Sequence, residues 1–421
     1  MLRTIIFLII VFSILFGLHF LALYTFRKFL KNKNVRKSIL NIISIAPFII
    51  FNLPFIWIII FKFNFSDLPK WIFNLYFLPF FAFQSSMLLI GLYLFAGKII
   101  KLIINIPIFI LKRFGKIREK IENLKSRKTV IKYDKSRRAF LTTSAALVSG
   151  YAFIGSGLGV IGKDRYEITY KDIKIKNLPD ELKGTTITLI SDIHSGPFMD
   201  ADMMKEYCDV INNLNSDLIF IPGDLTNTRR DEIHPFAKSF RDLKAKYGVY
   251  GTLGNHDYFS DAEYIASAVS NESPIKMLRN QTEFLNIKGK EICLIGIDDI
   301  RDSGAQKNKI LIDYLNTTLE KTDKKYEDLP KILLCHKPYI FREIKDNNID
   351  LMLSGHTHGG QIVFAKFGNI NFSIAATVSD LISGHYKEGD TNLYISRGIG
   401  TVGMPMRLNC PPEITQIKLV T

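Results

Sequence analysis

Residues able to bind metal ions recur in five short motifs between residues 192 and 358. The motifs are DIH at 192–194, GDLTN at 223–227, GNHD at 254–257, the histidine of LLCHKP at 336, and GHTH at 355–358. Carboxylate, amide and imidazole groups suit divalent manganese, iron or zinc better than a soft thiolate metal. The chain has only eight histidines, so their density in these motifs indicates metal chemistry.

The motifs supply more candidate ligands than one ion can hold. The candidates are Asp192, His194, Asp224, Asn255, His336, His356 and His358. One ion takes about four to six ligands, so this set favours two ions. A carboxylate shared between two ions holds them about 3.5–4 Å apart, where a water between them ionises near neutral pH. Asp224, which lies between the two histidine-bearing pairs in sequence order, is the expected shared carboxylate.

The neighbours of these ligands have expected roles of their own. In an extended backbone, residues i and i+2 point the same way, so DIH and HTH are each expected to act as a two-pronged pair. Glycine directly precedes Asp224, Asn255 and His356, where the backbone must turn or approach the ions closely. His256 lies on the opposite alternation from Asn255. It is expected to protonate a leaving oxygen, with Asp257 orienting it.

The elements that must position these residues alternate between short apolar runs and helix-periodic stretches from Tyr166 onward. Strands are expected within 185–192, 217–224, 248–257, 291–299, 331–338, 348–358, 391–398 and 413–420, a hairpin within 366–373, and helices within 203–216, 234–248, 262–271 and 308–321. Strands that alternate with helices indicate a layered α/β fold. Ligands bind where strands end in such sheets, and the candidate residues sit at those ends.

The first 162 residues have a different character. Apolar segments occupy about 4–26, 39–61, 71–95 and 140–162, and about 20 helical residues cross a bilayer. Residues 1–162 carry 23 Lys and Arg against 4 Asp and Glu, whereas 163–421 carry 32 against 36. The near-neutral second part argues against nucleic acid as a partner. We therefore expect a membrane region of about four spans over 1–162, followed by a soluble domain over 163–421.

The loops between the spans predict an orientation, because Lys and Arg concentrate on the cytoplasmic side. The loop 27–37 has six basic residues and no acid, and the loop 98–138 has 14 basic and 3 acidic residues. Both are expected in the cytoplasm, which leaves residues 163–421 outside it. Residues 101–125 are expected to lie on the inner leaflet as a basic amphipathic segment. Residues 135–150 resemble a twin-arginine export signal, although two anchoring arginines before a span explain them equally well.

The ordered motifs resemble the calcineurin-like metallophosphoesterases over about residues 166–421. The resemblance implies a four-layer α/β sandwich with a two-metal site, here preceded by an all-α transmembrane region. By the same resemblance, Asp192, His194 and His358 hold the first metal, Asn255, His336 and His356 the second, Asp224 both, and His256 is the general acid. The four cysteines show no metal-binding spacing, and we expect buried free thiols.

Two further stretches, GHTHGGQ at 355–361 and SRGIGTVGMPMRLNCPPEI at 396–414, resemble a membrane-associated bacterial branch of that family. Some of its members cleave the pyrophosphate of a UDP-linked acylated glucosamine, and others act as phosphodiesterases or phospholipid hydrolases. We therefore expect a two-metal phosphoesterase, with manganese favoured, that acts on a membrane lipid or lipid-linked phosphate. Arg397 and Arg407 are candidates for binding the substrate phosphate, or are surface arginines. A soluble-substrate phosphatase or nucleotidase, and a non-catalytic membrane scaffold or sensor, stay open as alternatives.

Overall fold

The computed structural model describes residues 2–33, 35–55, 68–125, 127–301, 306–367 and 370–421. The chain divides into two compact units, Met1–Val160 and Ile161–Thr421. The first unit is all-helical among its described residues, and the second contains every described strand. Each unit has its own core.

The N-terminal unit is built from long apolar helices. They are α1 (Leu2–Asn32), α2 (Lys37–Ile50), α4 (Lys70–Ile72), the π-helical turn η2 (Phe73–Phe77), α5 (Leu78–Leu111), α6 (Gly115–Lys125) and α7 (Lys128–Ile161). Four stretches are long and apolar enough to cross a membrane: Ile9–Asn32, Lys37–Phe55, Lys70–Leu111 and Lys132–Ile161. A helix satisfies its own backbone hydrogen bonds, which a bilayer requires. The last residues of the expected second span, 56–61, lie outside the described part of the chain.

One helix of this unit is longer than the sequence predicted. We expected the third span to end near Phe95 and residues 101–125 to form a separate segment, but α5 continues without a break to Leu111. Apolar residues follow Lys98 and Lys101 with nothing to stop a helix until Gly115, and Pro107 interrupts only one backbone bond near the C-terminus. The basic stretch 98–138 is therefore helical over most of its length, with α6 as a short polar helix.

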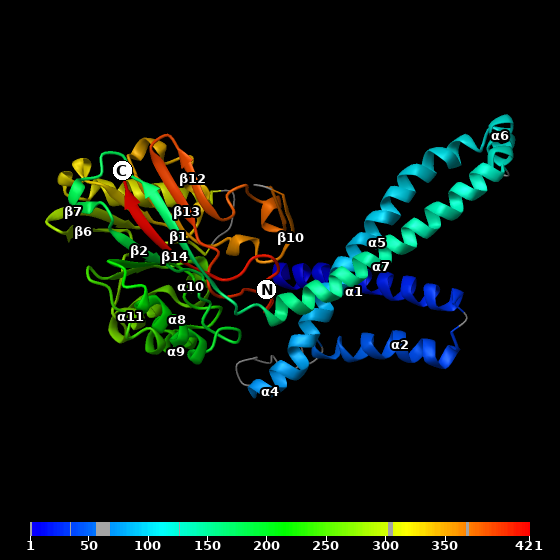
Figure 1. The fold of residues 1–421 in the computed structure, drawn as a ribbon, viewed down its shortest axis with the longest axis horizontal. Coiled ribbons are helices and arrows are strands. Elements are labelled where there is room, and N and C mark those ends of the chain that lie inside the picture. Colours follow the sequence, from blue (N-terminus) through cyan, green and yellow to red (C-terminus); the bar gives the residue numbers. More distant parts are fainter. Residues whose placement is uncertain (1, 34, 56–67, 126, 302–305, 368–369) are drawn as a thin grey trace. The chain divides into compact units, whose positions relative to one another are not determined.

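Two six-stranded sheets form the C-terminal unit (Figure 1). The first has the order β1 (Glu167–Lys174), β14 (Glu413–Val420), β2 (Thr186–Leu189), β3 (Leu218–Pro222), β4 (Val249–Thr252), β5 (Ile275–Met277). The second has the order β12 (Gly384–Glu388), β13 (Thr391–Ile395), β9 (Leu351–Ser354), β8 (Lys331–Leu334), β7 (Lys290–Gly296), β6 (Gln281–Ile287). Strands β2 to β5 are parallel, as are β7, β8, β9 and β13. Carboxyl ends of neighbouring strands therefore meet at one edge of each sheet.

Helices and turns cover the outer faces of the two sheets. The helices are α8 (Ala201–Asn213), α9 (Ile233–Ser239), α10 (Asn255–Ser260), α11 (Ala262–Glu272) and α12 (Lys307–Glu320). Short turns are η3 (Asp180–Leu182), η4 (Arg230–Glu232), η5 (Lys324–Asp328), η6 (Pro338–Ile340), η7 (Lys345–Asn347), η8 (His358–Gly360) and η9 (Ala375–Thr377), and β10 (Val363–Phe367) pairs with β11 (Ile370–Ser373) as a hairpin. Helix α9 ends at Ser239, earlier than predicted.

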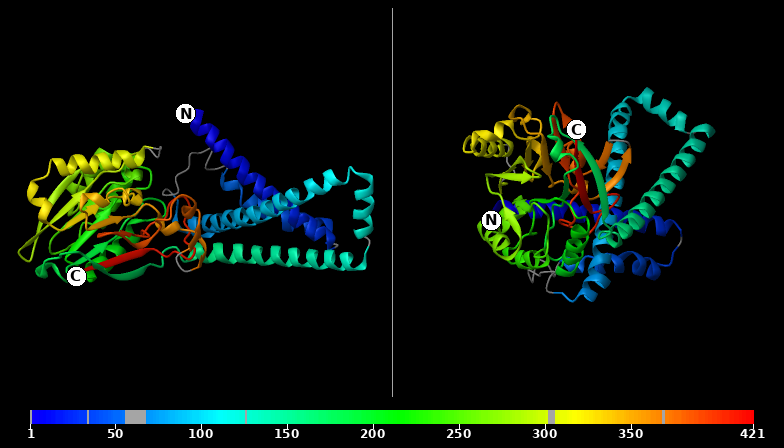
Figure 2. Two further views of the ribbon diagram at one scale, coloured as in Figure 1. Left: turned by 90° about the horizontal axis from the view of Figure 1, so that it is seen from above. Right: turned by 60° about the vertical axis from the view of Figure 1, so that its left-hand side comes forward.

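Alternation along the strands produces the layers. In β3, Phe220 faces the core between the two sheets, whereas Ile219 and Ile221 face the core beneath α8, α9 and α11. In β8, Leu334 faces the core between the sheets and Leu333 faces α12. Figures 1 and 2 show α8, α9 and α11 gathered on one face of the unit and α12, in yellow, along another. The predicted four-layer α/β sandwich is confirmed.

Candidate metal centre

All seven candidate ligands follow the carboxyl ends of strands. In the first sheet, two follow β2, one follows β3 and one follows β4; in the second sheet, one follows β8 and two follow β9. They are Asp192, His194, Asp224, Asn255, His336, His356 and His358. The two sheets face each other across the shared core, so these edges come together. The structure thus gathers residues that lie up to 166 positions apart in the chain.

Three groups of side chains in this cluster offer ligand atoms within 4.8 Å of one another. The groups are Asp192 with His194 and His358, Asp224 with His336 and His356, and His194 with Asp224 and His256. Asp224 belongs to two groups, and its Oδ2 lies 3.1 Å from His336 Nε2 and 3.5 Å from His194 Nε2. Its carboxylate is therefore placed between the two halves of the cluster, as a bridging ligand requires.

The donor atoms of the cluster are buried and incompletely satisfied by protein. His194 Nε2 faces His358 Nε2 at 3.0 Å, and two imidazole lone pairs at this distance need a proton or a cation between them. Buried Asn255 Oδ1 has no hydrogen-bond partner among the described residues. A buried polar atom without a partner is costly unless something else binds it. These atoms fit a cationic ligand.

Burial would lower the pKa of His336, but the carboxylates of Asp224 and Asp192 outweigh it and raise this pKa to about 10. Burial sets the protonation states of the other three ligand histidines in the direction that metal binding needs. It lowers the pKa of His194 to about 3 and lowers the pKa values of His356 and His358 well below the ordinary value, so all three favour the neutral imidazole. Burial would raise the pKa of Asp224, but His336 and His194 together hold it well below its usual range. Neutral imidazole and ionised carboxylate are the ligand forms of these side chains.

Two glycines allow the backbone to approach these ligands. A Cβ on Gly254 would lie 2.2 Å from Asp224 Oδ1, and a Cβ on Gly355 would lie 2.2 Å from Asp192 Oδ2. No side chain fits at either position without displacing a candidate ligand. The donor set, its burial and this close backbone packing together fit two divalent ions.

The backbone of the ligand loops differs from the prediction. We expected DIH and HTH to be extended, but Asp192, His194, His356 and His358 all adopt positive φ, between 49° and 71°. Strand β2 already ends at Leu189 and β9 at Ser354. The direction of these side chains is therefore set by the loop conformation and not by alternation along a strand. Non-glycine residues in the left-handed region cost about 1–3 kcal/mol each and cluster at functional sites.

His256 stands at the start of α10, beside the cluster. Its backbone N–H donates to Asp224 Oδ1 at 2.8 Å, and its ring lies edge-on to that of His194 with centroids 4.6 Å apart. His256 Nδ1 is hydrogen-bonded to the carbonyl oxygen of Asn227. Because a carbonyl can only accept, Nδ1 carries the hydrogen, which leaves Nε2 to give or take a proton.

The expected role of Asp257 is corrected by these contacts. Its buried carboxylate accepts the backbone N–H groups of Leu225, Thr226 and Gly254 at 2.9–3.0 Å and makes no described contact with the His256 ring. Asp257 sits in the first turn of α10, so its side chain points back to the helix start and not along the His256 ring. It holds the two ligand loops together, and Asn227 orients His256.

The two arginines expected at a substrate phosphate are also engaged elsewhere. The Arg407 guanidinium is buried and donates to the carbonyl oxygens of Gly400, Cys410, Arg397 and Gly398. Arg397 forms ion pairs with Glu167 and Glu413, at 3.0 and 3.3 Å. The described contacts of both guanidinium groups are with protein atoms, and phosphate binding by either arginine stays a prediction. Both arginines support the glycine-rich tail behind His358.

Sequence reasoning missed two features of this edge. Asp299, at the end of the segment after β7, forms a buried ion pair with Lys337 at 2.6 Å. Lys307 Nζ lies 4.3 Å from the centroid of the Tyr339 ring, and that ring lies 5.6 Å from the His356 ring. The two aspartates of GIDD at a strand end could have indicated the Asp299–Lys337 ion pair. Lys307 begins a helix, and its sequence context gives no indication of a role at the site.

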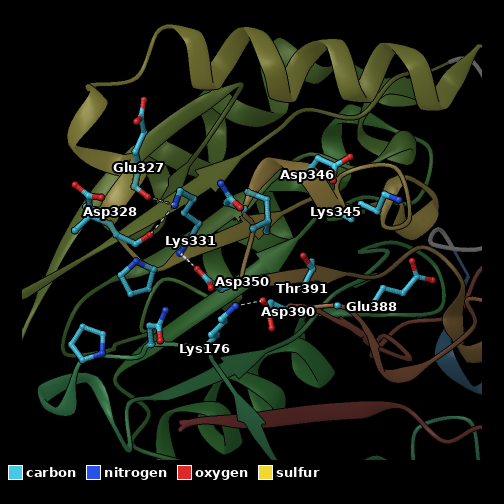
Figure 3. Close-up of a pocket in the computed structure, with 17 residues that line it drawn as sticks. Lys176, Glu327, Asp328, Lys331, Lys345, Asp346, Asp350, Glu388, Asp390 and Thr391 are labelled. Carbon is cyan, nitrogen blue, oxygen red and sulfur yellow. Dashed lines mark hydrogen bonds and ion pairs between the residues drawn. The ribbon is translucent and has the colours of Figure 1, made fainter.

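The cavity drawn in Figure 3 lies elsewhere on the C-terminal unit. It has a volume of about 630 Å³, and its lining includes Lys331, Asp350 and Thr391, at or next to the starts of β8, β9 and β13. The candidate ligands follow the opposite ends of the parallel strands β8 and β9. Several charges in this cavity are already satisfied: Lys331 donates to the carbonyls of Glu327 and Leu329, and Lys176 pairs with Asp390. We assign no function to it.

Comparison with known proteins agrees with the geometry. A family profile described as calcineurin-like phosphoesterase matches residues 185–360. An uncharacterized metallophosphoesterase of Helicobacter pylori (strain J99) is 31% identical over 306 residues, which are 72% of this chain and 75% of that protein. The metallophosphoesterase YkuE of Bacillus subtilis is 29% identical, over 68% of this chain and 97% of its own. A Danio rerio transmembrane protein with metallophosphoesterase domain is 29% identical, over 59% and 56%.

The chain belongs to the calcineurin-like metallophosphoesterase family. That family uses a dinuclear metal centre, and the three ligand groups described above are the candidate for it here. The protein is accordingly a metal-dependent phosphoric ester hydrolase. Its apolar helices and its likeness to named transmembrane proteins associate it with a membrane.

Proposed function

We propose that this protein hydrolyses a phosphodiester, phosphomonoester or pyrophosphate bond of a lipid-linked or amphiphilic substrate at the membrane. The observation that carries the proposal is the convergence of six of the seven predicted ligand side chains, from both sheets, with Asp224 between them. Helices able to cross a bilayer, in the same chain, favour a substrate that resides there. A phosphatase or nucleotidase for soluble substrates is the alternative.

Two divalent ions would be held by distinct ligand sets. Asp192, His194 and His358 would hold one ion, Asn255, His336 and His356 would hold the other, and Asp224 would be a ligand of both. When bound, such ions polarise phosphoryl oxygens and lower the pKa of water. We favour manganese, since the ligands are oxygen and imidazole nitrogen atoms without thiolate.

The protein side chains supply orientation and proton transfer. Asn227 holds the His256 ring through Nδ1, so Nε2 is the atom that protonates the leaving oxygen. The Asp257 carboxylate holds the loops of Asp224 and Asn255 together by accepting backbone N–H groups from both. Lys307, which has no ion pair with a described residue and rests on Tyr339 beside His356, is a candidate for substrate binding beside the two arginines. It binds a further anionic group of the substrate.

Charge supports an extracytoplasmic position for the catalytic unit. The basic residues of the first 162 positions gather in two segments, 27–37 and 98–138, and cytoplasmic segments carry such an excess. We propose four spans with both segments inside and residues 163–421 outside. Alkaline phosphatase and green fluorescent protein fusions after Gly162 test this. A fluorescent green fluorescent protein fusion together with an inactive alkaline phosphatase fusion would place residues 163–421 in the cytoplasm and contradict the orientation.

The activity is tested with the full chain in detergent micelles or nanodiscs. Manganese-dependent hydrolysis of bis-p-nitrophenyl phosphate should be present, and Asp224→Asn should abolish it without loss of folding. Asp209→Asn, an exposed carboxylate on α8, is the matched control and should retain full activity. Hydrolysis by Asp224→Asn at the control rate would contradict the assigned centre. A panel of lipid pyrophosphates, phospholipids and nucleotides then separates the membrane substrate from the soluble alternative.

A further inference from the structure

Exposed apolar side chains of the C-terminal unit concentrate in one short segment. Phe372 is 50% exposed, Ile374 65% and Val378 70%. Phe372 lies on β11, Ile374 between β11 and η9, and Val378 directly after η9. The other exposed large apolar residues described in this unit lie apart from one another, at the end of α7 and on β1, α10 and α11. We call residues 372–378 the apolar segment. Single exposed apolar residues need no explanation, but a cluster marks an interaction surface.

The apolar segment is fixed to the metal-site loop. The Asn371 side chain donates to the carbonyl of Gly359 at 3.4 Å. A Cβ on Gly360 would lie 2.5 Å from Ser373 Oγ, so the hairpin packs closely on the turn η8. This turn begins with His358, a candidate ligand. A surface that binds the apolar segment would therefore hold the candidate metal centre close to itself.

The chain itself indicates what that surface is. Four helices able to cross a membrane begin before the C-terminal unit, and the last of them runs to Ile161, the first residue of that unit. The unit is thereby tethered at a bilayer. Apolar side chains lower their free energy by entering the boundary between lipid head groups and acyl chains, and basic residues beside them attract anionic head groups. Lys366, exposed on β10, is such a residue.

We propose that the apolar segment inserts into the interfacial layer of the bilayer and holds the candidate metal centre at the lipid head groups. The occupant of this surface is a phospholipid bilayer. The proposal rests on the proposed function, since it assigns the substrate phosphate to the head-group layer. Phe372, Ile374 and Val378 act as membrane anchors and do not touch the reacting atoms.

Insertion is measured without reference to activity. Ile374→Cys in the full chain is labelled with an environment-sensitive nitrobenzoxadiazole dye and reconstituted in phosphatidylcholine nanodiscs; the four native cysteines are buried. Emission should shift to the blue and be quenched by head-group-proximal nitroxide lipids. Glu320→Cys, at the exposed end of α12, is the control and should stay unquenched. A blue-shifted but unquenched label at position 374 would show packing against protein and overturn the proposal.

The consequence for catalysis is measured with paired substrates. The triple variant Phe372→Ser, Ile374→Ser, Val378→Ser should lose about tenfold in kcat/KM on hexadecyl p-nitrophenyl phosphate in vesicles, because apolar burial that holds the domain at the bilayer is removed. Its activity on soluble bis-p-nitrophenyl phosphate should be unchanged. Equal rates with wild type on the vesicle substrate, or equal losses on both substrates, would contradict the proposal. Failure of the wild type on both substrates would instead reject the proposed function, while the quenching result still stands.

Discussion

His336 Nδ1 donates its hydrogen to the carbonyl oxygen of Pro222 at 2.8 Å. Pro222 ends β3 and His336 follows the end of β8 in the other sheet, so this bond joins the sheets at the edge that carries the candidate centre. Because Nδ1 holds the hydrogen, Nε2 is the nitrogen that faces Asp224 Oδ2 at 3.1 Å, where a proton or a cation must lie between the two atoms. A metal-binding histidine commonly has its other nitrogen fixed in this way. The tautomer suited to metal binding is therefore built into the packing of the sandwich.

Removing divalent ions should destabilise the C-terminal unit. Asp192 and Asp224 are buried carboxylates in one cluster, and ions that bind only the folded state add about 2.7 kcal/mol at a hundredfold excess over Kd. We expect EDTA to lower the Tm of the wild type and manganese to restore it. The Tm of Asp224→Asn should respond little to either. An unchanged wild-type Tm after complete chelation would argue against a resident metal centre.

His256→Gln should impair catalysis in proportion to the difficulty of the leaving group. A general acid contributes about 10²–10⁴-fold, and least when the leaving oxygen needs no proton. We expect a large fall in kcat for an alkyl phosphodiester and a small one for bis-p-nitrophenyl phosphate. His234→Gln, an exposed histidine paired with Glu272, is the control. Equal losses on both esters would contradict proton donation by His256.

Arg407→Lys should lower stability and leave substrate affinity unchanged. A lysine cannot reproduce the planar set of bonds to four backbone carbonyls, and unsatisfied buried acceptors plus a displaced charge cost about 3 kcal/mol. We expect a lower Tm, with the KM of the folded fraction at the wild-type value. Arg229→Lys, at an exposed arginine paired with Asp231, should change neither. A raised KM at unaltered Tm would instead identify Arg407 as a phosphate ligand.

Lys307→Gln should act on binding and spare folding. The lysine rests on Tyr339 beside His356 with no described ion pair, so its charge is free for a substrate. We expect KM to rise about three- to thirtyfold for the dianion p-nitrophenyl phosphate, with a smaller rise for the monoanion bis-p-nitrophenyl phosphate. Lys309→Gln, exposed on the same helix, is the control. The same KM change for both substrates would rule out recognition of the extra charge.

Asp350 should contribute a pH dependence at the cavity of Figure 3. Burial raises the pKa of this carboxyl, against the opposing effect of the Lys331 N–H. A raised pKa in the folded state means that folding favours the protonated form, so stability falls as pH rises through that pKa. Asp350→Asn cannot titrate. Its Tm relative to wild type should therefore increase from about pH 4 to about pH 7. A constant difference would show that the folded pKa is not raised.

The sequence by itself determined the chemistry of the site. Alternating apolar runs predicted the strands, and the position of Asp, Asn and His after those runs predicted which residues meet, because parallel strands bring their carboxyl ends to one edge. Seven oxygen and nitrogen ligands without a thiolate sufficed to indicate two divalent ions. The helices able to cross a membrane were likewise predictable from the sequence, since crossing a bilayer requires a minimum length of apolar residues.

Only the tertiary structure decided how the site is supported. The left-handed backbone at Asp192 and His356 and the choice of Asn227 to hold His256 depend on loop packing, which residue spacing does not encode. The burial of Arg407 against backbone carbonyls of its own tail also depends on packing. From the sequence, an arginine next to glycines could equally be exposed or buried. The closeness of the apolar segment to His358 likewise required the folded chain. Local sequence specifies which groups are available, and long-range packing specifies which of them are already satisfied.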